Sequence, residues 1–117
     1  MKDFMFIYRN GDSTWMERAT PEQIQAVMAK WGAWISALGA KGQLVTGGAP
    51  LERGGKRLRK DGVLTDLAAA ELKELVTGYS IVKAESYEEA AAIARECPIF
   101  HDPGATVEIR TVAAMEL

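Results

Sequence analysis

The hydrophobic pattern of residues 3–9 predicts a β-strand, in which successive side chains fall on alternating faces. Aromatic side chains fall on one face and mainly aliphatic ones on the other: Phe4, Phe6 and Tyr8 against Met5, Ile7 and Arg9. Because both faces are apolar except at Arg9, we expect a central strand that is covered on both sides. Asn10-Gly11-Asp12 ends this strand, and a loop is expected to run to Ala19.

A long helix is predicted to begin at Thr20. Thr20 can cap it, Pro21 suits the first helical position, and Gln23 completes a capping box. The apolar residues that follow recur at helical spacing and form one stripe: Ile24, Val27, Met28, Trp31, Ile35 and Leu38. Trp34 lies beside this stripe. It could border a pocket or an interface, although a tryptophan at the rim of the core is the simpler interpretation.

The middle of the chain predicts a short strand followed by a hairpin. Residues 44–46 form the strand, which runs into Gly47-Gly48; paired glycines allow another backbone or a ligand to come close. Residues 56–65 form the hairpin, with Asp61-Gly62 as a two-residue turn. The polar character of its first arm indicates an edge position in a sheet.

The stretch from Val63 to Val82 connects this hairpin to the second half of the fold. It passes one acidic residue, Asp66, which can cap a short helix over residues 67–75. It then enters a strand at Gly78-Tyr79. A short polar detour between two strands is a place where a small domain can hold chemistry without disturbing its core.

The second half repeats the strand–helix–strand order. Residues 79–84 alternate as a strand, and Ser86 with Glu89 predicts a second capping box. The helix of residues 87–97 ends before Pro98 and carries a stripe of small or apolar side chains: Ala90, Ile93, Ala94 and Cys97. A loop over residues 99–105 then leads into a last strand, Thr106–Val112.

The predicted order is β-α-β-(hairpin)-β-α-β in one domain spanning residues 1–117. This order indicates a ferredoxin-like α+β sandwich with an antiparallel sheet and two main helices on one face. Two helices cover only one face, whereas the first strand is apolar on both. We therefore expect a homodimer that packs sheet against sheet, which gives a dimeric α+β barrel.

Composition and charge narrow the classes of partner. The net charge of −2 argues against general nucleic-acid binding. Basic residues gather in the predicted hairpin, where a solvated surface is the simplest explanation: Arg53, Lys56, Arg57, Arg59 and Lys60. A single cysteine, Cys97, excludes an internal disulfide. With no apolar run long enough for a signal peptide or a membrane span, we expect a cytoplasmic protein.

With these elements placed, the sequence resembles the YCII-related family, in the branch marked by an Asp-Gly-Pro-Phe motif. The likeness is carried by segments along nearly the whole chain: FMFIYRN, PEQIQAVMAKWGAWI, GGAPLERGGKRLRKDGVLTD, ELKELVTGY and ECPIFHDPGATVEIRTV. The resemblance implies a ferredoxin-like dimer. The motif begins at Asp66, but Leu67, Ala68 and Ala69 replace its Gly, Pro and Phe. The resemblance also implies a His–Asp pair with the histidine in the N-terminal half, where this chain has none.

The enzymatic hypothesis pairs Asp66 with the one histidine, His101. A histidine can move a proton near neutral pH, and an adjacent aspartate fixes its tautomer. Arg9 and Tyr79 could hold an anionic or phenolic substrate. The resemblance makes an elimination or other lyase-type reaction on a small organic molecule conceivable. In the simpler alternative, His101 is a solvated turn residue and Asp66 only caps a helix.

The alternative function is non-catalytic. A dimer would enclose a largely apolar pocket lined by Trp31 or Trp34, Phe6, Tyr8 and Tyr79, with Arg9 as the polar anchor, in a binding module; a third alternative is dimerisation alone. We expect no metal, because one histidine and one cysteine cannot form a typical zinc site. We also expect no nucleotide cofactor, because no glycine pair opens a helix in a phosphate-binding pattern.

Overall fold

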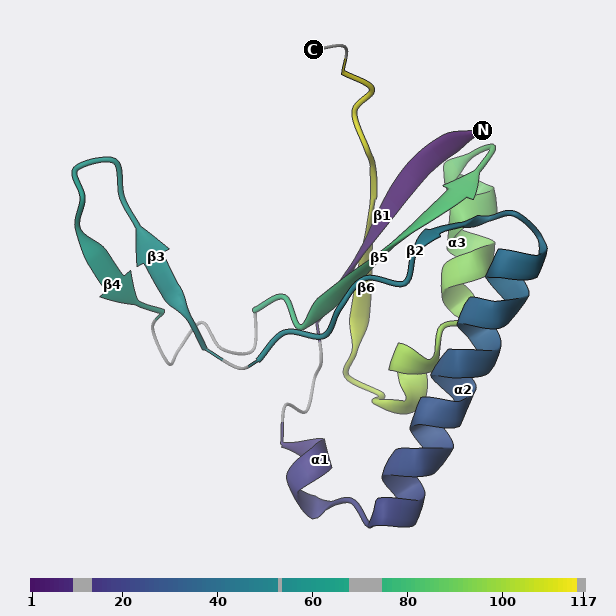
Figure 1. Cartoon of the computed structure of the whole chain (residues 1–117), viewed down its shortest axis with the longest axis horizontal. Coiled ribbons are helices and arrows are strands. Elements are labelled where there is room, and N and C mark those ends of the chain that lie inside the picture. Colours follow the sequence, from purple (N-terminus) through teal and green to yellow (C-terminus); the bar gives the residue numbers. More distant parts are fainter. Residues whose placement is uncertain (10–13, 53, 68–74, 116–117) are drawn as a thin grey trace.

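Two helices lie on one side of a four-stranded antiparallel sheet (Figure 1). The computed structural model describes residues 1–9, 14–52, 54–67 and 75–115. Its elements are, in order, β1 (Lys2–Arg9), α1 (Trp15–Arg18), α2 (Pro21–Ala40), β2 (Leu44–Thr46), β3 (Lys56–Leu58), β4 (Leu64–Asp66), β5 (Gly78–Ala84), α3 (Tyr87–Arg95), the 3₁₀-helix η2 (Pro98–His101) and β6 (Thr106–Thr111).

The sheet has the strand order β2-β5-β1-β6, and each neighbouring pair is antiparallel. β1 lies between β5 and β6, as predicted for a central strand. Together with the two β-α-β halves, this order confirms the ferredoxin-like α+β fold. The helices cover one face of β1. Within the described part of this one chain, no helix covers the other face (Figure 1).

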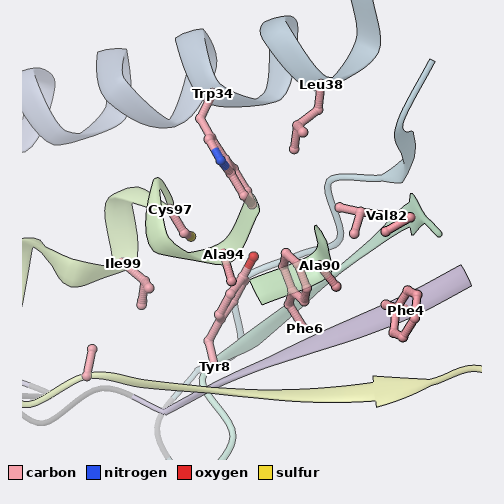
Figure 2. Packing of buried hydrophobic residues seen from close by; sticks show 12 residues of the cluster. Phe4, Phe6, Tyr8, Trp34, Leu38, Val82, Ala90, Ala94, Cys97 and Ile99 are labelled. Atoms are coloured by element: carbon pink, nitrogen blue, oxygen red, sulfur yellow. The ribbon is translucent and has the colours of Figure 1, made fainter. Parts of the chain in front are cut away.

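The core lies between the sheet and its two helices (Figure 2). Phe4, Phe6 and Tyr8 alternate along β1 and are buried, since a strand turns every second side chain to the same face. They meet α2 at Trp34 and Leu38. Small side chains on α3, Ala90 and Ala94, are buried against the sheet as well. This confirms that α3 packs closely through small residues.

The helix α2 begins with the predicted capping box: Thr20 Oγ1 accepts from the Gln23 backbone N–H, and the Gln23 side chain accepts from Thr20 N–H. Its buried stripe differs from the prediction by one position. Met28 is 62% exposed, whereas Trp34 is buried and stacks on Phe6 at 6.4 Å between ring centroids. The helix is rotated so that Trp34 joins Trp31 and Leu38 on the face toward the sheet.

Helix α3 ends at Arg95, two residues before the predicted end at Cys97, because Pro98 starts η2. Its predicted capping box forms only in part. Ser86 Oγ accepts from Glu89 N–H, but the Glu89 carboxylate accepts from the Gln43 side chain at 3.0 Å instead of from Ser86 N–H. The short helices α1 and η2 lie within segments predicted as loops.

The hairpin of β3 and β4 differs from the prediction in its turn and in its place. Gly62 N–H donates to Arg59 C=O, and Arg59 N–H donates to Val63 C=O, so the loop has three residues, 60–62, with Gly62 at φ +88°. β3 and β4 form a separate two-stranded sheet and not an edge of the main one. Asp66 belongs to β4. Most of the predicted helix over residues 67–75 lies outside the described residues.

A buried chain of hydrogen bonds connects two strands, β1 and β5, and the segment that follows β2. Tyr8 Oη donates to Ser80 Oγ at 2.8 Å, and Ser80 Oγ donates to the Gly47 carbonyl at 2.9 Å. Each hydroxyl therefore has a partner, which removes most of the cost of burying it. Cys97 lies beside Tyr8, and burial raises the pKa of its thiol to about 11. Burial also raises the pKa of the Tyr8 phenol.

At Gly48, just after β2, the chain lies close to the backbone of β5. It has φ +73°, and a Cβ there would lie 1.7 Å from the Tyr79 carbonyl oxygen. Only glycine fits, so the glycine pair serves contact with another backbone, one of its two predicted uses. Gly32, in the middle of α2, differs because a Cβ there would have no heavy atom within 4 Å.

Replacing each of these two glycines by alanine should therefore change the free energy of unfolding in opposite directions. Gly48→Ala is expected to cost several kcal/mol, because backbone atoms must shift and φ is positive. Gly32→Ala should stabilise by roughly 0.5–1 kcal/mol, the gain of alanine over glycine in an exposed helix interior. Urea unfolding followed by circular dichroism measures both. Equal midpoints for the two variants would contradict the described packing at Gly48.

The Cys97 thiol should resist alkylation in the folded protein. Only the thiolate is nucleophilic, and a pKa raised to about 11 leaves almost none at pH 8. Iodoacetamide at pH 8 should label native protein slowly, and labelling should accelerate in 8 M urea, which restores the ordinary thiol pKa. Mass spectrometry measures the fraction of chains that carry the adduct. Fast native labelling would mean that the thiol is not buried as described.

Candidate functional site

The sheet face turned away from the helices is the first candidate for a functional surface. The cross-strand register gives its residues, which come from the three long strands: Asp3, Met5, Ile7, Arg9, Tyr79, Ile81, Lys83, Thr106, Glu108 and Arg110. Met5 lies opposite Ile81, and Ile7 lies opposite Tyr79. These four side chains are half-buried by their neighbours and form an apolar centre. We call this surface the open face.

Charged residues bound the apolar centre at both ends of β1. Lys83 Nζ lies 3.0 Å from Asp3 Oδ1 at one end, and Arg9 Nη1 lies 3.5 Å from Glu108 Oε1 at the other. Such partly exposed ion pairs stabilise a fold by about 0–1 kcal/mol, so their main effect is on what the surface can meet. An apolar centre inside a polar rim is the usual anatomy of a protein interface.

A hollow of about 470 Å³ adjoins Arg9 at the end of the open face. Its lining is mainly polar and comes from β1 and β6: Arg9, Thr106, Val107 and Glu108. The Arg9 guanidinium presents N–H donors in a planar fork, which suits a carboxylate or phosphate. The hollow is open to solvent.

A second hollow, of about 570 Å³, lies beside the β3–β4 hairpin. Residues before β3 and after β4 line it: Pro50, Leu51, Glu52, Gly54, Leu67, Leu75 and Val76. Its lining is mainly apolar, and Glu52 is the charged side chain among the described residues that line it.

The sheet separates the four residues predicted to bind a ligand. Arg9 and Tyr79 lie on the open face. Trp31 and Trp34 lie under α2 on the opposite face, where Trp31 meets Tyr8 edge to face at 5.6 Å and Trp34 at 5.7 Å. The tryptophans therefore take part in the core, and only Arg9 and Tyr79 share a surface that a ligand could reach.

The two residues predicted as an acid–base pair have different neighbours. Asp66 projects from β4, is exposed, and pairs with Lys56 Nζ on the adjacent strand. His101 ends η2, and its ring lies 4.5 Å from that of Trp15 in α1. Both therefore take part in local contacts of separate elements. Their catalytic role stays a prediction.

Glu108 and Thr106 were not among the predicted site residues, although they border Arg9. The alternation in residues 106–111 indicates that Glu108 faces away from the core. The partner across the sheet depends on register, which pairs Arg9 with Thr106 and Ile7 with Glu108. Val107 and Ile109 help to fix that register, because they pack against the core on the other face of the same strand, and Val107 also borders the hollow.

The described ranges of the chain contain no group of three or more histidine, cysteine, aspartate or glutamate side chains placed to hold a metal ion. Likewise, none of the helices described there combines the length and the apolar character needed to cross a bilayer.

Comparison with known proteins agrees with the architecture. No curated protein matches the chain. The profile of the YCII-related domain, in contrast, matches residues 1–116, nearly the whole sequence. The strand order, the two helices on one face and this match lead to one conclusion: the chain belongs to the YCII-related domain family.

Proposed function

We propose that this protein is a homodimer that binds a small anionic or phenolic molecule at the seam between two open faces. The observation that carries the proposal is the open face itself, with an apolar centre that ends at Arg9 and its hollow. A twofold axis would place one copy of this surface on another, so that Met5, Ile7 and Ile81 of both copies become buried.

Burial of this face gives the driving force for association. Each fully buried Met, Ile or Tyr side chain contributes about 1.5–3 kcal/mol relative to exposure. The side chains of Met5, Ile7, Tyr79 and Ile81 are already half-buried within one chain, so each contributes a part of that figure. The charged rim then sets the register, because a misplaced copy would bring Lys83 or Arg9 against an apolar centre.

The binding site follows from the same arrangement. In one chain the hollow at Arg9 is open, and a second copy would supply the missing walls. Tyr79 adds an aromatic surface on the same face, and Arg9 supplies the charge. A small, mainly polar site that includes Arg9, with the aromatic ring of Tyr79 on the same face, selects molecules that combine a carboxylate or phenolate with an apolar body.

The contacts favour binding over acid–base catalysis. A proton relay requires its two groups within hydrogen-bond reach or one water of each other. Asp66 pairs with Lys56 in the hairpin, and His101 packs on Trp15 beside η2. We therefore assign the site on the open face to recognition. An elimination or lyase activity would need Asp66 and His101 to be brought together in another way.

The dimer is tested by a charge placed in the apolar centre. Ile7→Lys should convert a dimer into a monomer, since burying an unpaired ammonium between two sheets is strongly unfavourable. Met28→Lys is the matched control, because Met28 is exposed on α2. Sedimentation equilibrium at micromolar concentration measures the mass. If wild type and Ile7→Lys share one mass, the sheet-to-sheet association is wrong.

Ligand binding is tested by a thermal-shift screen with benzoate, salicylate, aliphatic monocarboxylates and simple phenols. A ligand that binds the native state raises the melting temperature, because at one hundred times its Kd it adds about 2.7 kcal/mol to the free energy of unfolding. Arg9→Gln should weaken the apparent affinity about tenfold and so reduce the shift. Lys83→Gln, which removes a cation from the other end of the face, should not. A panel without any hit, or hits that Arg9→Gln leaves unchanged, would refute the assignment.

A further inference from the structure

The β3–β4 hairpin is not explained by the fold or by the proposed site. We call residues 56–66 the arm. It forms its own two-stranded sheet and stands away from the main sheet, on the side opposite the helices (Figure 1). An isolated two-stranded hairpin is only marginally stable in water, so an arm of this kind needs a surface to pack on.

The dimensions of the chain show that it is less compact than a domain of its length usually is. A compact domain of this length has a radius of gyration of about 13 Å. The observed value is 15.9 Å, and the principal extents are 46 × 43 × 20 Å. One chain is therefore broad and thin.

One face of the arm is apolar at its centre. Leu58 and Leu64 lie directly opposite each other in the ladder and share that face. They are 69% and 56% exposed, although paired leucines in a sheet are normally covered. The next pair, Lys56 and Asp66, forms an ion pair on the same face. The apolar contact is thus bounded by charge, as on the open face.

Charge and area both favour a second copy of this chain as the occupant. The arm has four cations and two carboxylates, a net +2, so the rest of the chain carries −4. The arm of one copy is therefore attracted to the body of another. The open face alone is small: the four strands, of three to eight residues each, cover roughly 400 Å² in plan. A standard interface buries about 800 Å² per partner, and the arm would add part of the difference.

We propose that each arm clasps the other copy of the dimer, with the face of Leu58 and Leu64 packed against that copy's surface. This inference rests on the proposed function, because it takes the sheet-to-sheet dimer as given. The arm stands on the side of the open face, where the second copy would lie (Figure 1). A clasp on each flank also closes the ends of the seam, including the end that holds Arg9.

Dissociation constants from a dilution series test the clasp. In the variant Leu58→Ser/Leu64→Ser the dimer should dissociate at a concentration higher by on the order of tenfold or more, since the loss of a single buried leucine is already of that size. Val63→Ser is the matched control. Val63 is an exposed apolar residue of the same arm, but the alternation of side chains puts it on the other face. Circular dichroism should show an unchanged fold in both variants.

The outcomes separate the two proposals. A dimeric wild type with an unchanged dissociation constant in Leu58→Ser/Leu64→Ser overturns the clasp and leaves the sheet-to-sheet dimer intact. A wild type that is monomeric at all concentrations overturns both. An equal increase of the dissociation constant in Val63→Ser would mean that the effect does not depend on the leucine face. That result also overturns the clasp.

A cross-link gives a second, independent readout. Leu58→Cys can be labelled with benzophenone maleimide, because Cys97 is buried with a raised pKa and should not compete. On irradiation of the dimer, the product should have twice the mass of one chain, and its cross-linked peptide should come from outside the arm. A product of single-chain mass at every concentration would show that the arm packs on its own chain.

Discussion

The sheet of this protein has two apolar faces, but the helices of the described chain cover only one of them. Phe4, Phe6 and Tyr8 are buried under α2 and α3, while Met5 and Ile7 alternate with them toward the other side. A strand cannot hide both sets of side chains in one two-layer sandwich. The open face, its charged rim and the protruding arm are all consequences of this constraint.

The contacts on the buried face of the sheet fix the positions of the side chains on the open face. Tyr8, Ser80 and Gly47 are joined by hydrogen bonds across the core, and Gly48 brings two backbones closer than any other residue would allow. These contacts hold β5, β1 and the segment after β2 in one register. Because side chains alternate, the same register sets Tyr79 beside Ile7 and Arg9 beside Thr106. The packing of the core thus fixes which side chains lie together on the open face.

In the function proposed above, the binding site belongs to the assembly more than to the single chain. Each hollow is open, and the charged ends of the open face and the leucine pair of the arm are all surfaces that one copy leaves uncovered. A second copy would cover them together. The residues with the chemistry of catalysis, Asp66 and His101, are instead held in separate local contacts. Recognition by Arg9 is the simpler use of this surface.

Local sequence signals determined the order and ends of the main elements, because capping residues, prolines and alternation act over a few residues. Thr20 with Gln23, Pro98 and the period-two pattern of β1 led to the ferredoxin-like fold. Only tertiary packing decided the rest. The rotation of α2, which buries Trp34 and exposes Met28, depends on the sheet beneath it. The detachment of the hairpin from the main sheet depends on which strand pairs with β5. The sequence by itself therefore named Arg9 and Tyr79, but only the register across three strands brought them onto one face and left both tryptophans on the other.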